Sequence, residues 1–315
     1  MREKYRTYLI LVLVGFLAAC SSGGAQLEGE LVSTEKRIKE LGDAIDGGSL
    51  RNAYMIKQYA QVLSQSRPEL APLLTELSKE ATRSNPLFQS LTSRYSAVRN
   101  ETEAFDSWVE KVEELQLIQS AADTESFNDA LSDTVNVIAD LSQGELARVN
   151  AVSKKTELQS NDAKDYGAGS QYVGNPHYGH WSHGSGGSLW AWYGQYHFFS
   201  SMFGGNRYYY NDWAGRRGYS YYHDVGRGSY TSRSQRASQN DVDRRARKQF
   251  GSGNRYKSPY SKTRSGATGM SKSSLAKQKS AFKSPYSKST ASTSKFQSST
   301  RNSSFRTSRS SSRGK

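Results

Sequence analysis

Apolar residues recur at alternating steps of three and four through the first half of this chain. Residues spaced in this way lie along one face of an α-helix, so the pattern predicts amphipathic helices within residues 27–141. We expect the first helix to end at Gly47-Gly48, because paired glycines interrupt a helical pattern. Its apolar stripe consists of Leu27, Leu31, Thr34, Ile38, Leu41 and Ile45.

Local capping signals divide the rest of this region into further helices. Ser49 is a suitable N-cap for a second helix, and Pro68 begins a separate segment. Asn85-Pro86 is the strongest helix start, because asparagine accepts hydrogen bonds from free amides and proline already lacks one. An unbroken helix from there to about Ile118 would be roughly 50 Å long. A last helix is expected to open at Thr124.

These helices predict a mainly α fold, an antiparallel helical bundle with coiled-coil-like packing over residues 27–160. Amphipathic helices joined by short polar turns bury their apolar stripes against one another. The segment contains no histidine, so its many carboxylates do not form the Glu-x-x-His pattern of a di-metal bundle. One alternative stays open, in which the bundle is a scaffold that docks another protein.

The amino terminus has the composition of a secretory signal. Arg2, Lys4 and Arg6 precede an apolar run over residues 8–19. That run is shorter than the roughly 20 residues that a membrane-spanning helix needs. Residues 1–19 are therefore expected to be a signal peptide and not part of the fold.

The signal ends in Leu17-Ala18-Ala19-Cys20, and Cys20 is the single cysteine of the chain. This sequence resembles the lipobox of bacterial lipoproteins. The resemblance implies that Cys20 carries acyl chains such as palmitate and becomes the first residue, with residues 20–26 as a flexible tether. Serine at Ser21 then implies the outer membrane, facing the periplasm. Two or three acyl chains hold a protein on a bilayer firmly.

Charge divides the chain into an acidic and a basic part. Residues 21–165 carry 15 Lys and Arg against 24 Asp and Glu, whereas residues 166–315 carry 25 against four. This asymmetry predicts an acidic folded module joined to a basic interaction segment. The basic segment could also fold back on the acidic module.

Residues 161–230 are rich in glycine and aromatic residues. Twelve of the 20 tyrosines, four of the five tryptophans and all five histidines lie within residues 166–230. Tryptophan settles at the headgroup level of membranes, so Trp190 and Trp192 are candidate membrane contacts. Packing of these rings on the helical bundle is the alternative, and periodicity does not decide between the two.

Three histidines of this segment are candidate metal ligands. His177, His180 and His183 lie three residues apart, and neutral imidazoles suit zinc or copper. The spacing matches no known metal motif, and glycine-rich flanks would hold the ligands poorly. A zinc- or copper-binding lipoprotein is therefore kept as an alternative, and no cofactor is expected otherwise.

The remaining residues, 231–315, are predicted to be a disordered basic tail. They hold 24 serines and 21 Lys and Arg against two acids, which leaves too little apolar surface for a core. The hexapeptide KSPYSK occurs twice, each time after an aromatic residue. Repeated rings flanked by cations are typical of proteins that hold polyanions without reading a sequence. The candidate contacts are Tyr256, Lys257, Tyr260, Lys262, Phe282, Lys283, Tyr286 and Lys288.

These observations favour a non-enzymatic lipoprotein of the bacterial cell envelope. No set of acid, base and nucleophile has a spacing that indicates catalysis. An exported, lipid-anchored chain meets anionic envelope polymers and lipids before it meets nucleic acid. We therefore expect the membrane and an anionic polymer or lipid as partners, and a protein partner of the bundle as the alternative.

Overall fold

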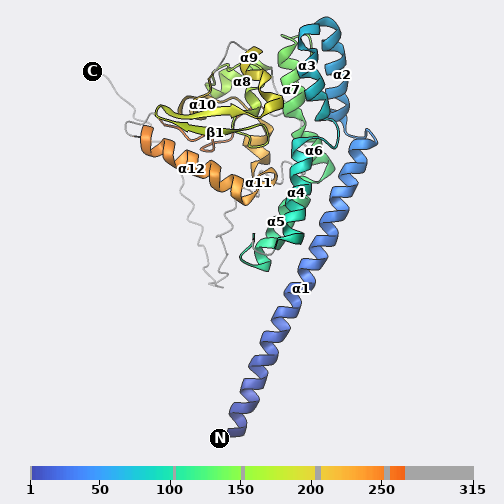
Figure 1. Cartoon of the computed structure of the whole chain (residues 1–315), viewed down its shortest axis with the longest axis vertical. Coiled ribbons are helices and arrows are strands. Elements are labelled where there is room, and N and C mark those ends of the chain that lie inside the picture. The colour runs from blue at the N-terminus through green and yellow to red at the C-terminus, as the bar shows by residue number, and fades with distance from the viewer. Residues whose placement is uncertain (1, 102–103, 150–152, 203–206, 252–255, 267–315) are drawn as a thin grey trace, which may run out of the picture. The chain divides into compact units, whose positions relative to one another are not determined.

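The computed structural model describes residues 2–101, 104–149, 153–202, 207–251 and 256–266, with side chains from residue 23 onward except at 201–202. These residues are mainly helical with one small β-hairpin, which confirms the expected mainly α class (Figure 1). In chain order the elements are α1 (Arg2–Asp46), α2 (Arg51–Ser66), η1 (Pro68–Leu70), α3 (Ala71–Lys79), α4 (Pro86–Asn100), α5 (Trp108–Ala121), α6 (Thr124–Ala130), α7 (Ser132–Leu141), α8 (Lys154–Asn161), η2 (Ser170–Tyr172), β1 (Gly179–Gly184), β2 (Gly187–Trp192), η3 (Gly194–Tyr196), α9 (Phe198–Met202), α10 (Tyr210–Arg216), η4 (Tyr222–Gly226), α11 (Arg227–Tyr230) and α12 (Arg233–Phe250).

Helix α1 ends directly before the paired glycines, as predicted. Gly48 has a φ of 66°, in the left-handed region that glycine enters at little cost. The expected cap of α2 is wrong by one residue, because Leu50 occupies the N-cap position and makes no side-chain bond there. The Ser49 hydroxyl instead donates to the carbonyl oxygen of Ala44 at 3.1 Å, which closes the end of α1.

The backbone of α1 is helical through residues 20–26, so the expectation of a flexible tether there is wrong. A helix continues as long as each amide reaches the carbonyl four residues earlier, and this stretch contains no proline to prevent that. In the part of the chain that the structure describes, no helix is both long and apolar enough to cross a bilayer.

The predicted helix start at Asn85-Pro86 is confirmed. The Asn85 side chain accepts from the amide of Leu87 at 2.8 Å, and Pro86 is the first residue of α4. The expectation of one unbroken helix to Ile118 is wrong, because α4 ends at Asn100 and α5 begins at Trp108. The break lets α5 pack against α4, so that both helices turn apolar residues inward.

Two groups of helices make up the helical part. Helix α1 packs along α5 and α4, while α2 packs on α3 and α7. The last predicted helix does open at Thr124, but a break at Leu131 divides it into α6 and α7. The buried residues between these helices include Leu41, Ile56, Leu63, Leu73, Leu77, Leu91, Leu115, Ile118, Phe127, Val135 and Ile138.

The aromatic segment folds around the hairpin of β1 and β2. The strands are antiparallel, with Trp181 opposite Trp190 and Gly184 opposite Gly187. Strand β2 alternates between buried and half-buried positions, as expected for a strand with one face on a core. Gly179 is required by a close approach, because a Cβ there would lie 2.3 Å from the carbonyl oxygen of Ala191. Figure 1 shows the hairpin beside α10 and α12.

The prediction that the disordered tail begins at residue 231 is wrong, because the folded part of the chain continues beyond it. Residues 233–250 form α12, and residues 256–266 pack against the folded part of the chain. Helix α12 buries Gln239, Val242 and Ala246, which lie three and four residues apart on one face. The average composition of residues 231–315 concealed this short amphipathic stretch.

Candidate functional site

The three histidines of the predicted metal site have separate partners. The Nε2 atom of His177 lies 2.7 Å from the carbonyl oxygen of Tyr230, and burial lowers the pKa of this imidazole to about 4. The Nδ1 atom of His183 lies 2.9 Å from the hydroxyl of Ser188. His180 is exposed and its ring stacks on Tyr193.

These separate roles leave no convergent metal site. Across the described residues, no group of three or more His, Cys, Asp or Glu side chains is placed to hold a metal ion. His177, His180 and His183 thus do not form the zinc or copper site that their spacing suggested. Three imidazoles on a turn and a hairpin strand point toward different neighbours, because alternate residues of a strand face opposite sides.

The tryptophans expected at the membrane interface are buried in the fold. Trp190 and Trp192 are 5% and 9% exposed, and their rings meet edge to face. Trp192 also packs on Phe199. Burial of such large rings is a major source of stability, so these two residues belong to the core and do not contact a membrane.

The first KSPYSK copy and the tyrosine before it are part of the fold, so their rings are not free to insert into a partner. The Tyr256 hydroxyl donates to the carboxylate of Asp243, and the Arg227 guanidinium lies 3.8 Å from the centre of the Tyr260 ring. Such a cation–π contact holds the ring in place. Lys257 and Lys262 remain exposed.

The other predicted contacts lie outside the described residues. This applies to the second KSPYSK copy and the phenylalanine before it, and to the side chain of the predicted lipidation site. The residues concerned are Cys20, Phe282, Lys283, Tyr286 and Lys288.

Helix α12 presents a basic surface that the sequence analysis assigned to the disordered tail. Ser232 caps the helix by accepting from the amide of Gln235 at 3.2 Å, while the Gln235 side chain accepts from the amide of Ser232. This reciprocal pair fixes where the helix begins.

The helix carries six Lys and Arg against two Asp. Its exposed cations near the carboxyl end are Arg244, Arg245, Arg247 and Lys248.

Two aspartates on the same helix position these cations. Asp241 pairs with Arg244 and also lies 3.9 Å from Arg245, and Asp243 lies 3.4 Å from Arg247. Pairs four residues apart on an exposed helix stabilise it by only about 0.3–0.5 kcal/mol each. The four exposed cations against these two aspartates leave two positive charges in excess, so the surface attracts anions.

A shallow groove separates the end of α12 from the tip of the hairpin. We call it the hairpin groove. Its wall on the hairpin side carries the His183 imidazole, and its wall on α12 carries Arg245 and Gln249. These side chains offer N–H donors, which suit the oxygen atoms of an anion. The complete lining is His183, Gly184, Gly187, Ser188, Tyr210, Arg245, Ala246, Gln249 and Phe250.

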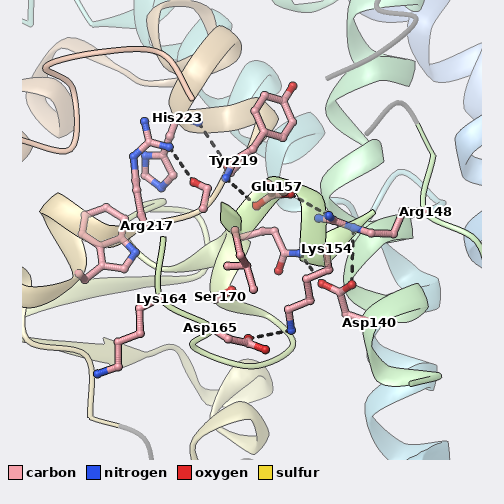
Figure 2. Close-up of a pocket in the computed structure, with 15 residues that line it drawn as sticks. Asp140, Arg148, Lys154, Glu157, Lys164, Asp165, Ser170, Arg217, Tyr219 and His223 are labelled. Carbon is pink, nitrogen blue, oxygen red and sulfur yellow. Dashed lines mark hydrogen bonds and ion pairs between the residues drawn. The ribbon is translucent and has the colours of Figure 1, made fainter. Parts of the chain in front are cut away.

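A second, polar pocket lies between α7, α8 and the aromatic segment, and Figure 2 shows that its charged groups face one another. Arg148 lies between two carboxylates, 2.7 Å from Glu157 and 3.5 Å from Asp140. Lys154 lies 2.8 Å from Asp165. The charges of this polar pocket are therefore largely used within the protein.

Two buried acceptors of the polar pocket lack a protein donor. The Nε2 atom of His223 lies 2.8 Å from the carbonyl oxygen of Val173, so Nε2 carries the hydrogen and Nδ1 is left as an acceptor. Burial lowers the pKa of His223 well below its ordinary value, which keeps the ring neutral. Among the residues that the structure describes, neither His223 Nδ1 nor the Gln171 side-chain oxygen has a hydrogen-bond partner.

The remaining space fits water and not a substrate. The free volume of about 20 Å³ is enough for roughly one water molecule. The polar pocket is therefore too small to hold a substrate. The cations of α12 and the polar groups of the hairpin groove, in contrast, face solvent.

The basic surface could have been found from local signals. The Ser232 and Gln235 capping box and the apolar positions at Val242 and Ala246 predict a helix start and a buried face. A count over the whole tail concealed both.

Comparisons of this chain with protein-family models, with curated proteins and with solved structures found no match.

Proposed function

We propose that this chain is a non-enzymatic lipoprotein of the bacterial cell envelope that binds anionic polymers or lipids on the surface of α12. The lipobox-like sequence that ends at Cys20 supports the anchor. The anchor places the protein on a membrane, and we assign it to the outer membrane facing the periplasm because serine follows the cysteine. The helical part, packed as a bundle, is its folded body.

The exposed cations of α12 carry this proposal. Arg244, Arg247 and Lys248 lie on the solvent side of a helix whose other face is buried, so the helix cannot turn them inward. Lys257 and Lys262 add two exposed cations shortly after this helix. A fixed row of positive charge raises the local concentration of polyanions without recognising a sequence.

The acidic part of the chain favours binding at one place. Residues 21–165 carry a net negative charge, which repels an anionic polymer from the helical part. The two aspartates of α12 reduce the attraction only in part. An anionic chain is therefore directed to α12, the hairpin groove and the basic residues that follow.

The test is co-sedimentation of a chain of residues 21–315, which lacks the acylated cysteine and so reports only binding by the protein surface, with three anionic probes, namely lipopolysaccharide, vesicles containing phosphatidylglycerol, and peptidoglycan. A variant with Arg244→Gln, Arg247→Gln and Lys248→Gln should bind vesicles roughly 100-fold more weakly at low salt, because each cation near an anionic surface contributes about 1 kcal/mol. Binding by the unmodified chain should weaken as salt is added.

A matched variant controls for the loss of three charges. Lys36, Lys39 and Lys57 are exposed cations on α1 and α2, and their replacement by Gln should leave binding unchanged. If both triple variants weaken binding equally, the effect comes from net charge and the assignment to α12 is wrong. If neither variant weakens it, α12 is not the binding surface.

A further inference from the structure

One tryptophan stands apart from the other four. Trp108, the first residue of α5, is 45% exposed, and the adjacent Val109 is equally exposed. The other tryptophans pack in the aromatic core, Trp181 partly and the remaining three with less than a tenth of their surface exposed, namely Trp190, Trp192 and Trp213. A large exposed ring beside an exposed valine is costly in water and suits a partner that accepts apolar groups.

The fold places this ring close to the predicted lipid anchor. A Cβ atom added to Gly23 would lie 3.0 Å from the Trp108 indole, so the backbone of α1 contacts the ring there. Gly23 follows Cys20 by three residues, which is about 5 Å along a helix. Figure 1 shows α5 beside α1, in agreement with the packing of α1 on α5.

The charges around Trp108 show no excess of cations, because Asp106, Glu110 and Glu113 outnumber Lys111 and Arg233. Glu110 pairs with Arg233, the first residue of α12, and this pairing lowers the pKa of the Glu110 carboxyl. The Lys111 ammonium lies 5.8 Å from the centre of the Phe105 ring. Asp106 is exposed and adds negative charge. A contact between this surface and a membrane therefore depends on insertion of the Trp108 ring and not on attraction to anionic lipid.

We infer that Trp108 and Val109 lie in the headgroup region of the phospholipid bilayer that holds the lipidated Cys20. This inference rests on the lipid anchor of the proposed function. Tryptophan prefers this depth because its ring is apolar and its N–H remains hydrated. A lipid anchor plus an inserted side chain gives two attachment points, which together restrict the orientation of the protein on the membrane. The contact replaces the one that the sequence suggested for Trp190 and Trp192.

The experiment measures quenching of tryptophan fluorescence by brominated phosphatidylcholine in vesicles that carry the lipidated protein. The mass of the amino-terminal peptide is measured on the same sample to establish lipidation of Cys20. We expect quenching in the unmodified protein, its loss in Trp108→Phe, and its retention in Trp181→Phe. Because the contact is apolar, quenching should stay constant between low and high salt, unlike binding of polyanions to α12.

The outcomes separate the two proposals. If the peptide is lipidated and Trp108→Phe is quenched as strongly as the unmodified protein, the membrane contact is wrong while the anchor stands. If the peptide is not lipidated, both the anchor and the contact fail. Loss of quenching that is confined to Trp108→Phe in the lipidated protein supports the contact, and a second copy or a polymer on this surface would give no such quenching.

Discussion

At the scale of single residues, two buried carboxyl groups join the helical part to the aromatic segment. Glu80 accepts from the hydroxyls of Thr134 at 2.6 Å and Tyr178 at 2.9 Å. Asp133 accepts from the backbone amides of Tyr221 and Tyr222 at 2.8 and 3.0 Å. Burial raises the pKa of each carboxyl to about 7, although these hydrogen bonds lower it in part. Both groups therefore titrate near neutral pH in the folded protein.

A raised carboxyl pKa in the folded state makes unfolding more favourable as pH rises. The unfolded chain releases the Glu80 proton near pH 4.5, whereas the folded chain keeps it until about pH 7. Between these values the folded state binds more protons, so the stability that this group contributes is full below pH 4.5 and declines up to about pH 7. Above that value the contribution is lost.

Glu80→Gln should remove this dependence. Between pH 5 and pH 8 the free energy of unfolding of the unmodified protein should fall relative to that of the variant by roughly 3 kcal/mol, since one pKa unit corresponds to about 1.4 kcal/mol. Urea titrations at the two pH values measure the difference. Glu76→Gln is the control, because Glu76 makes a surface pair with Lys79. Equal pH dependence in Glu80→Gln and the unmodified protein would show that Glu80 is ionised in the folded state.

At the scale of elements, side-chain caps mark where α4 and α5 begin, whereas periodicity does not reveal where α4 ends. Asn85 starts α4 because its side-chain oxygen accepts hydrogen bonds from the backbone amides of Leu87 and Phe88. Its side-chain nitrogen donates to the carbonyl oxygen of Glu80 at 2.7 Å. The Ser107 hydroxyl starts α5 by accepting from the amide of Glu110. The apolar pattern alone continues through the break between α4 and α5, so periodicity could not reveal the turn.

Asn85→Ala should destabilise the protein by about 1–2 kcal/mol, because the buried amides of the first turn of α4 lose their acceptor. Ser49→Ala, in which the lost hydroxyl donates to a helix end in an exposed connection, should cost clearly less. Both values come from urea denaturation at one pH. A loss in Asn85→Ala no larger than that in Ser49→Ala would mean that α4 does not depend on this cap.

At the scale of the whole chain, residues 256–266 return to the folded part and complete a buried ion pair. Arg217 and Asp224 make two hydrogen bonds of 2.8 and 2.7 Å. The carbonyl oxygen of Pro259 accepts from the Arg217 guanidinium, and the amide of Arg264 donates to Asp224. A buried pair is favourable only when its remaining donors and acceptors are satisfied, and this returning segment satisfies them.

Two truncated proteins, one that ends before this segment and one that ends after it, should therefore differ in stability. A chain that stops at Gly251 should unfold at lower urea concentration than one that stops at Gly266, with a loss on the order of 3 kcal/mol, because Arg217 and Asp224 each lose a buried hydrogen-bond partner. The chain that stops at Gly266 is the matched control. Identical midpoints for the two chains would show that the returning segment adds nothing to the fold.

The sequence by itself determined the features that depend on neighbouring residues. Apolar stripes predicted helices, Gly47-Gly48 and Asn85-Pro86 marked an end and a start, and Cys20 stands in a lipobox-like context. These signals are local, because capping and helical periodicity act within a few residues of the chain.

Only the tertiary structure decided which side chains are buried and which face a partner. Trp190 and Trp192 are of a residue type that often contacts membranes, yet the rings of Trp181, Phe199 and Tyr208 pack against them. Trp108, in contrast, stays exposed. Tyr256 and Tyr260 repeat the pattern of a free binding motif, yet Asp243 and Arg227 hold them in the fold. Burial is the sum of contacts between distant segments, and no local pattern contains that information.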